Sequence, residues 1–316
     1  MSPLRDGTKK VMILGATAPL PRAARVALRA RGLGALEVAK AKRAQLLLIA
    51  HPKSGNTWLK VMISRLYQVR HGLPDSLIHK TDEFTRVVPS VPRLAATNGI
   101  YSYEGAVGRL LDPESGDPSM RDKAVLFLAR HPCDIAVSWY FQFTKRQSRH
   151  KQELINAELA HPIDRTKIEM WDFVRHSDIG LEHLIGFLNG WERKLASHPR
   201  ATTIRYEDLR GEPEATLRRV TELLGEDFSD EEIGEAVRYG SFDHLKQLEG
   251  QGHFKQGGLT LRNSADPESF KVRRAKVGGY VDYFTPEQVA ELDEIVAKQL
   301  SPTLGYGPLS EVRPLS

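Results

Sequence analysis

Short apolar runs alternate along this chain with segments in which apolar residues recur at helical spacing. The apolar runs cover residues 45–50, 93–97, 123–129 and 202–206, and the helical patterns that follow them cover residues 57–69, 103–111, 134–146 and 213–224. Strands that alternate with helices in this way are typical of a parallel sheet with helices on both faces. The pattern predicts a single α/β domain over residues 45–310, with an N-terminal arm (residues 1–44) before it and a C-terminal tail (residues 311–316) after it.

The most informative segment joins the first predicted strand to its helix. It reads His-Pro-Lys-Ser-Gly-Asn-Thr-Trp over residues 51–58. Backbone N–H groups at a tight turn and at the N-terminus of a helix attract anions. Lys53 adds a positive charge, Ser54 and Thr57 add hydroxyl donors, and Trp58 offers an aromatic face on which a nucleobase can stack. The segment therefore predicts a binding site for a phosphate-like anion.

The order of residues in this loop separates it from the ATPase loop, in which the lysine follows the second glycine. Here Lys53 precedes Gly55. The order Pro-Lys-Ser-Gly-Asn-Thr-Trp instead resembles the 5′-phosphosulfate loop of sulfotransferases that use 3′-phosphoadenosine 5′-phosphosulfate (PAPS). Asn56 stands where that family commonly has threonine. The resemblance implies a P-loop-like sheet and a nucleotide site that includes Lys53, Ser54, Gly55, Asn56, Thr57 and Trp58.

A second junction between a predicted strand and a helix carries Arg130, Asp134 and Ser138. Arg130 follows the strand at its carboxyl end, where open α/β sheets bind ligands. Asp134 is well placed as a helix N-cap, and Ser138 lies one turn further on. Arginine with serine suits a phosphate group, whereas the simpler reading is an ion pair between Arg130 and Asp134. The spacing Arg-x-Pro-x-Asp-x-x-x-Ser resembles the 3′-phosphate motif of the same family.

Three further segments extend the resemblance over most of residues 45–290. The segment 205–209, Arg-Tyr-Glu-Asp-Leu, is similar to a family segment whose tyrosine contacts adenine, which implies this role for Tyr206. The segment 240–242, Gly-Ser-Phe, is similar to a nucleotide-contacting Thr-Ser-Phe and implicates Ser241 and Phe242. The segment 273–280 resembles a basic, glycine-rich family motif. By that resemblance Arg273 and Arg274 clasp the 3′-phosphate with the N–H of Ala275, which replaces a glycine.

The resemblance implies a PAPS-dependent sulfotransferase. Such an enzyme transfers a sulfuryl group from PAPS to a hydroxyl or amine of a small molecule, lipid or glycan and releases PAP. The transfer is in-line, so catalysis rests on positioning and electrostatic stabilisation, as in phosphoryl transfer. Lys53 is the expected catalytic cation that stabilises the leaving phosphate. No metal is required, and the sequence suggests no metal-binding cluster.

The general base is the weak point of the resemblance. Many cytosolic family members have Lys-Thr-His at the end of the second strand, where this chain has Ala96-Thr97-Asn98. Asn98 cannot accept a proton at neutral pH. His79 and Glu104 are the two alternative candidates for a catalytic base, and an acceptor of low pKa, such as a phenol, needs little help. The sequence does not choose among these.

Two other classes of function stay open. A small-molecule kinase requires an ATP-type loop and an acidic magnesium ligand, and the nearest strand-end acids, Asp134 and Asp208, belong to sulfotransferase-like segments. A protein that binds the nucleotide without catalysis is favoured by Asn98 and opposed by the intact Lys53. The acceptor is unknown, because residues 70–122 and 145–180 carry no readable motif.

Charge is concentrated at the N-terminus. Residues 1–44 hold ten lysines and arginines against Asp6 and Glu37, whereas the rest of the chain is slightly acidic. Arg22, Arg25 and Arg29 share one helical face, which is typical of a weakly amphipathic basic helix. One interpretation is a solvated arm, and the other is a peripheral contact with an anionic membrane surface. A nucleic-acid partner is disfavoured because aromatic residues are not interleaved with the basic ones.

Cellular location is constrained by cysteine and hydropathy. The one cysteine, Cys133, rules out an intrachain disulfide and gives no reason for an oxidising compartment. The apolar segment 11–20 contains a glycine and a proline, so we interpret it as part of the arm rather than as a signal peptide. The sequence therefore predicts a cytoplasmic protein, with association at the membrane periphery as the alternative. The oligomeric state is not predicted.

Overall fold

The computed structural model describes residues 5–75, 81–99, 102–114, 116–251 and 276–306. In this part of the chain a parallel sheet has the strand order β2-β1-β3-β4. The strands are β1 (Leu46–Ala50), β2 (Leu94–Thr97), β3 (Ala124–Ala129) and β4 (Ala201–Arg205). Ile49 lies level with Thr97 of β2 and with Phe127 of β3. The predicted α/β class is confirmed, and so is the position of each predicted strand to within one residue.

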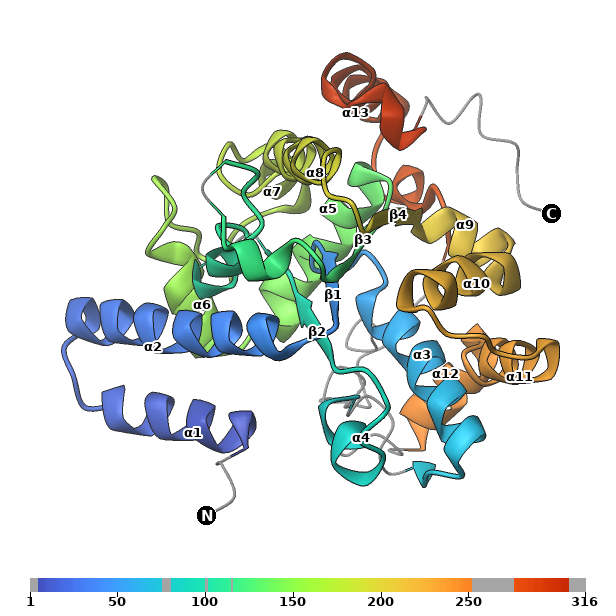
Figure 1. Ribbon diagram of the computed structural model, residues 1–316. Coiled ribbons are helices and arrows are strands. Elements are labelled where there is room, and N and C mark those ends of the chain that lie inside the picture. Colours follow the sequence, from blue (N-terminus) through green and yellow to red (C-terminus); the bar gives the residue numbers. More distant parts are fainter. Residues whose placement is uncertain (1–4, 76–80, 100–101, 115, 252–275, 307–316) are drawn as a thin grey trace.

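Helices connect the strands and surround the sheet (Figure 1). The described α-helices are α1 (Asp6–Thr17), α2 (Arg22–Arg43), α3 (Asn56–His71), α4 (Thr81–Val87), α5 (Pro132–Phe141), α6 (Arg149–Asn156), α7 (Met170–Arg175), α8 (Leu181–Leu195), α9 (Tyr206–Gly211), α10 (Pro213–Leu224), α11 (Asp230–Tyr239), α12 (Phe242–Gly250) and α13 (Pro286–Gln299). Shorter elements are the 3-10 helices η2 (Ser102–Val107), η3 (Pro118–Met120), η6 (Gly279–Tyr283) and η7 (Pro302–Leu304), and the π-helix η4 (Gln142–Arg146).

The two faces of the sheet bury alternate residues of each strand, as the two-residue period of a strand requires. On one face, Leu47, Ile49 and Phe127 pack with apolar residues of α5, α8 and α13. On the other, Leu48 and Leu126 pack with apolar residues of α3, α10 and α11. Strands buried on both sides explain why the sequence shows continuous apolar runs rather than alternation.

The N-terminal segment forms a helical hairpin, α1 and α2, along one side of the molecule (Figure 1). Leu33 of α2 is buried against Tyr103 of η2 and Leu154 of α6. Lys123 Nζ donates hydrogen bonds to the carbonyl oxygens of Lys42 and Ala44, which holds the C-terminus of α2 beside the start of β3. The hairpin is thus packed on the α/β domain. Among the described helices, none combines the length and the apolar character needed to cross a membrane.

Two predicted helices differ from the observed elements. The pattern over residues 103–111 forms the short 3-10 helix η2. The helix predicted over residues 134–146 begins at Pro132, which suits the first helical position because proline has no N–H to leave unpaired. It then widens into the π-helix η4. Helical spacing alone does not distinguish these tighter and wider turns.

Candidate active site

The loop between β1 and α3 has an unusual backbone. Lys53 has φ of 81°, the one positive φ of a non-glycine residue in the described ranges, and Gly55 at the N-terminus of α3 has φ of 100°. A lysine in this region is strained by about 1–3 kcal/mol. Such strain persists only where the surroundings determine the conformation, and it concentrates at functional sites. The loop is therefore shaped to present its backbone at the N-terminus of α3.

Three buried polar atoms gather at this loop without a hydrogen-bond partner among the described residues. They are Ser54 Oγ, Asn56 Oδ1 and Arg130 Nε. A buried polar group without a partner costs about 1–3 kcal/mol. Two of these atoms are donors, and both suit the oxygens of a phosphate or sulfate group. The donor set therefore fits the nucleotide that the sequence predicts.

Arg130 extends from the end of β3 across the loop. Its Nη1 donates to the Lys53 carbonyl oxygen at 3.0 Å, and its guanidinium lies 4.3 Å from the centre of the Tyr206 ring. The ion pair with Asp134 is also present, at 3.5 Å. The ion-pair reading of Arg130 is therefore confirmed, and the arginine also supports the backbone of the lysine loop. Its binding of a 3′-phosphate stays a prediction.

Asp134 is not the N-cap of α5, as we had expected from the sequence. His131 occupies that position, and Asp134 lies in the first turn. Its carboxylate instead accepts hydrogen bonds from the backbone N–H groups of Gly278 (2.9 Å) and Tyr280 (3.0 Å). Arg130 Nη2 donates to the carbonyl of the nearby Lys276 at 3.4 Å. These contacts bring the C-terminal segment to the edge of the sheet where the loop lies.

Tyr206 forms the aromatic side of the loop. Tyr206 begins α9 directly after β4, and its ring is so close to Gly55 that an added Cβ would lie 2.7 Å from Cδ2. The Trp58 ring meets the Tyr206 ring edge-on at 5.6 Å. Trp58 Nε1 donates to the Gly240 carbonyl at 2.6 Å, which ties the segment before α12 to the same place. Loop, tyrosine and tryptophan thus form one continuous wall.

A buried hydrogen-bond cluster holds the ends of β3 and β4 together. Glu207 accepts from the backbone N–H of His131 at 3.0 Å and from Tyr306 Oη at 2.9 Å. Burial raises the pKa of Glu207 and lowers that of His131. The His131 ring stacks on Tyr280. Arg130 and Tyr206, which follow these strands, are fixed by this cluster.

Comparison with known proteins agrees with this geometry. The family model of the sulfotransferase domain matches residues 43–303. The chain belongs to the sulfotransferase family. Cytosolic sulfotransferase 13 of Arabidopsis thaliana is 28% identical over 83% of this chain and 78% of its own length. The flavonol 4′-sulfotransferase of Flaveria chlorifolia is 24% identical over 84% of this chain and 81% of its own length.

A solved structure supports the fold. The crystal structure of a mouse sulfotransferase complexed with PAP has a TM-score of 0.50 to this protein, at 20% identity, and the match covers 83% of this chain and 87% of that one. The predicted family, the fold class and the class of enzyme, a PAPS-dependent sulfotransferase, are therefore confirmed.

The other residues of this sulfotransferase that the sequence predicts to bind the nucleotide belong to α3, α5 and the start of α12, or lie outside the described residues. Ser138 is half-buried on α5, and Thr57 lies in the first turn of α3. Ser241 is the N-cap of α12, where its Oγ accepts from the N–H of His244. Phe242 opens α12 with Arg210 and Lys246 near its ring. Arg273, Arg274 and Ala275 lie outside the described residues.

The structure describes the candidate catalytic bases only in part. His79 lies outside the described residues; Glu104 lies in η2, and its side chain is not among those described. Asn98 follows β2 directly and is half-buried, next to the turn at Gly99, whose N–H donates to Thr97 Oγ1. The described part of the chain contains no group of three or more His, Cys, Asp or Glu residues that could hold a metal ion.

The sequence interpretation gave His51 no role, yet this residue contacts the backbone of the lysine loop and packs against the core beneath the sheet edge where the loop begins. It is fully buried, its Nδ1 lies 2.8 Å from the Pro52 carbonyl oxygen, and its carbonyl accepts from the N–H of Ser54. Its ring packs edge-on against Trp139 and Phe187. Burial lowers the pKa of His51 to about 3, so the ring is neutral at physiological pH. The signal in the sequence was its place at the end of a strand, immediately before Pro52.

Proposed function

We propose that this sulfotransferase binds PAPS against the wall formed by residues 51–58, Arg130 and Tyr206, and transfers its sulfuryl group to a hydroxyl or amine. The observation that carries the proposal is the convergence at one edge of the sheet of a strained lysine loop, an arginine bonded to the Lys53 carbonyl, and a tyrosine packed on Gly55. PAPS has two phosphate groups and an adenine, which matches two cationic junctions beside aromatic rings.

In this arrangement the loop binds the 5′ side of the nucleotide, through the N-terminus of α3, Ser54, Asn56 and Thr57. Arg130 and Ser138 bind the 3′-phosphate, together with Arg273, Arg274 and the N–H of Ala275. Trp58, Tyr206, Ser241 and Phe242 contact the adenine side. Lys53 stabilises the charge that develops on the leaving phosphate, since a preorganised cation acts most strongly where charge appears in the transition state.

The acceptor is a small molecule, lipid or glycan, and PAP is the second product. Either His79 or Glu104 takes the proton of the acceptor, because Asn98 cannot. One relative is named a flavonol sulfotransferase, so phenols are the first acceptors to test. No metal takes part in this scheme. The cytosolic names of several relatives favour a cytoplasmic enzyme, and contact of residues 1–44 with a membrane is a separate proposal.

Titration with PAP by calorimetry tests the donor site. We expect PAP to bind and ATP with magnesium to bind much more weakly. Arg130→Ala should weaken PAP binding by at least about tenfold, since a charge-assisted contact contributes roughly 1.5–3 kcal/mol. Arg121→Ala is the matched control, because Arg121 is exposed and its side chain has no hydrogen bond or ion pair in the described structure.

A preference for ATP with magnesium would refute the PAPS site and favour the kinase alternative. Tight PAP binding with no turnover of PAPS, over a panel of phenols, alcohols and amines, would instead favour a protein that binds the nucleotide without catalysis.

A further inference from the structure

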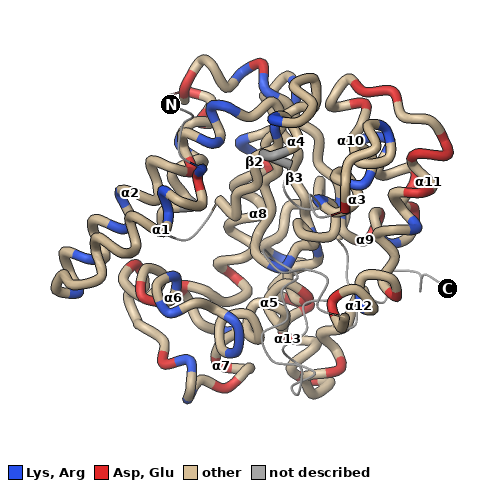
Figure 2. Tube along the Cα trace, turned by 90° about the horizontal axis from the view of Figure 1, so that it is seen from below, with Lys and Arg blue, Asp and Glu red and all other residues tan. Residues whose placement is uncertain are grey.

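A groove separates the N-terminal hairpin from α6, away from the lysine loop. It has a volume of about 650 Å³. Three arginines of α2 line it, Arg22, Arg25 and Arg29, and α6 contributes Arg149 and Glu153. Figure 2 shows the basic segments of α1 and α2 beside α6, whereas acidic segments gather around α11. The groove is the place where the N-terminal charge meets the domain.

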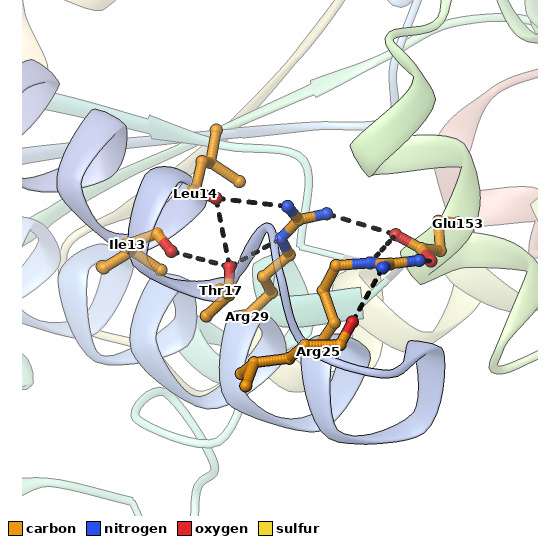
Figure 3. Close-up of polar contacts among 7 residues, drawn as sticks. Ile13, Leu14, Thr17, Arg25, Arg29 and Glu153 are labelled. Carbon is orange, nitrogen blue, oxygen red and sulfur yellow. Dashed lines mark hydrogen bonds and ion pairs between the residues drawn. The ribbon is translucent and has the colours of Figure 1, made fainter.

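Two of the arginines that line the groove, Arg25 and Arg29, are held by hydrogen bonds (Figure 3). Together with Glu153 we call them the floor of the groove. Arg25 Nε donates to both carboxylate oxygens of Glu153, and its Nη1 donates to the Leu20 carbonyl. Arg29 is buried and donates to Glu153, to Thr17 Oγ1 and to the Leu14 carbonyl. These bonds hold the two guanidinium groups in place, so their charge is preorganised.

The other two arginines of the groove differ from these in their contacts. Arg22 and Arg149 are exposed at the groove, and neither makes a hydrogen bond or ion pair with another described residue. The groove is therefore lined by four arginines and by one carboxylate, that of Glu153. Hydrogen bonding to Arg25, with the charges of Arg29 and Arg22, lowers the pKa of Glu153, so the carboxylate is ionised and the groove still has a positive excess.

A purely structural role does not account for this arrangement. The contacts of Glu153 with Arg25 and Arg29 are sufficient to dock the hairpin on α6. Arg22 and Arg149 make no hydrogen bond or short ion pair in that docking, although the charge of Arg22 acts on Glu153 from a distance. Like charges brought together repel one another unless an anion compensates them. Arg22 comes from α2 and Arg149 from α6, and both line the same groove. Two guanidinium groups that line one groove can bind one oxyanion together.

We propose that this groove binds the phosphate group of an acidic ligand between Arg22 and Arg149, over the floor formed by Arg25, Arg29 and Glu153. Leu14 and Ala18 give the groove an apolar side, so the ligand has an apolar part next to its phosphate. The site is independent of the proposed nucleotide site, which lies at the carboxyl edge of the sheet.

Two sources supply this chemistry, the headgroup of an acidic phospholipid and a soluble phosphate. The hairpin favours the phospholipid headgroup, because the apolar side chains of Val11 and Met12 on α1 and of Leu28 on α2 are exposed. Large apolar side chains beside basic ones are typical of helices that lie on anionic membranes. The experiment below has one arm for each source.

The variant that tests the site is Arg22→Gln with Arg149→Gln. Both residues are exposed and make no bond within the described structure, so the fold should persist, which thermal unfolding checks. The control is Arg109→Gln with Arg121→Gln, which removes the same charge from exposed arginines outside the groove. A second variant, Arg149→Glu, reverses the charge at the mouth of the groove and should weaken binding further than Arg149→Gln does.

In the first arm the proteins are sedimented with vesicles of phosphatidylcholine alone or mixed with phosphatidylglycerol. Each basic residue near an anionic surface strengthens binding about fivefold. The affinity of the double variant for the anionic vesicles should therefore fall roughly 25-fold, and that of the control much less. In the second arm the same proteins are titrated with inorganic phosphate at constant ionic strength. Phosphate bound at the nucleotide site affects every variant equally and cancels in the comparison.

A label at Met12→Cys separates the two sources further. The native Cys133 is fully buried and burial raises its thiol pKa well above the ordinary value, so a maleimide fluorophore reacts at the new cysteine. A blue shift on anionic vesicles, lost in the double variant, assigns the phosphate to lipid. Binding of inorganic phosphate that needs Arg22 and Arg149, with no blue shift, assigns it to a soluble ligand. The proposal is overturned if neither arm detects binding, or if the double variant and its control behave alike.

Discussion

Lys53 is the residue whose charge the proposed reaction uses directly. In Lys53→Ala we expect the turnover of PAPS to fall about 10²–10³-fold, the usual cost of removing one preorganised stabilising group. PAP affinity should fall much less, because the backbone of the loop, Ser54 and Arg130 remain. Initial rates at saturating PAPS, beside calorimetry with PAP, measure the two effects. Lys167→Ala, at an exposed lysine, serves as the control, and equal losses of rate and affinity would contradict the assignment.

Gly55 occupies a position that only glycine fits. Its φ of 100° and the 2.7 Å approach of Tyr206 Cδ2 to an added Cβ both exclude a side chain. Gly55→Ala should therefore destabilise the protein by about 1–3 kcal/mol and displace Tyr206, with loss of PAP binding. Urea unfolding and PAP titration measure these changes.

Gly186 offers a matched control for that substitution. It lies within α8, and an added Cβ would meet no atom within 4 Å. Gly186→Ala should stabilise the protein by roughly 0.5–1 kcal/mol, because alanine has the higher helix propensity. Similar unfolding curves for the two variants would show that the loop tolerates a side chain.

Among the elements, α5 is the one that organises the site, because Asp134 in its first turn binds the N–H groups of Gly278 and Tyr280. In Asp134→Asn one carboxylate oxygen becomes an N–H₂ group that faces a backbone donor, and Arg130 loses its counter-ion. We expect a loss of about 1.5–3 kcal/mol in unfolding free energy, the range for hydrogen bonds to charged groups.

PAP affinity should fall in the same variant, since the C-terminal segment and Arg130 are both released. Asp122→Asn is the control, at an exposed aspartate whose side chain makes no bond in the described structure. An unchanged affinity would mean that the C-terminal segment does not contribute to the nucleotide site.

The elements also show where sequence reasoning succeeds. Strands β1 and β3 are continuous apolar runs that end at Ala50 and Ala129, so the sheet and its parallel direction follow from pattern alone. The role of Asp134 did not follow, because its partners are 144 and 146 residues away in sequence. The burial of His51 was missed for the same reason, since Trp139 and Phe187 cover it from helices that no local pattern connects to the loop.

At the scale of the whole molecule, buried histidines couple stability to pH. His51 is neutral in the fold because burial lowers its pKa to about 3, and burial also lowers the pKa of His131 and of the half-buried His183. Unfolded histidine takes up a proton below about pH 6.5. The unfolded chain therefore binds more protons below that pH, and stability, complete above it, decreases as the pH falls. For His51 the decrease continues to about pH 3, by at most about 1.4 kcal/mol per pH unit.

Urea unfolding of the wild type and of His51→Gln, between about pH 7 and about pH 5, measures this coupling. The variant should be less stable near neutrality, because a packed ring is lost, yet its stability should depend less on pH. His71→Gln, at an exposed position at the end of α3, should keep the wild-type slope. Parallel curves for wild type and His51→Gln would contradict a neutral buried imidazole.

The contacts of Arg130 and Asp134 with residues 276–280 also bear on how the protein is made. During synthesis, β1, β3 and β4 leave the ribosome long before Lys276, and N-terminal parts of a chain fold first. Any part of the sheet that has assembled by then surrounds an Asp134 carboxylate whose partners, the N–H groups of Gly278 and Tyr280, have not yet been made. The nascent chain carries this open position until residues 276–280 have left the ribosome. If these contacts complete the proposed nucleotide site, a chain stalled on the ribosome before Lys276 should bind PAP less tightly than the released protein.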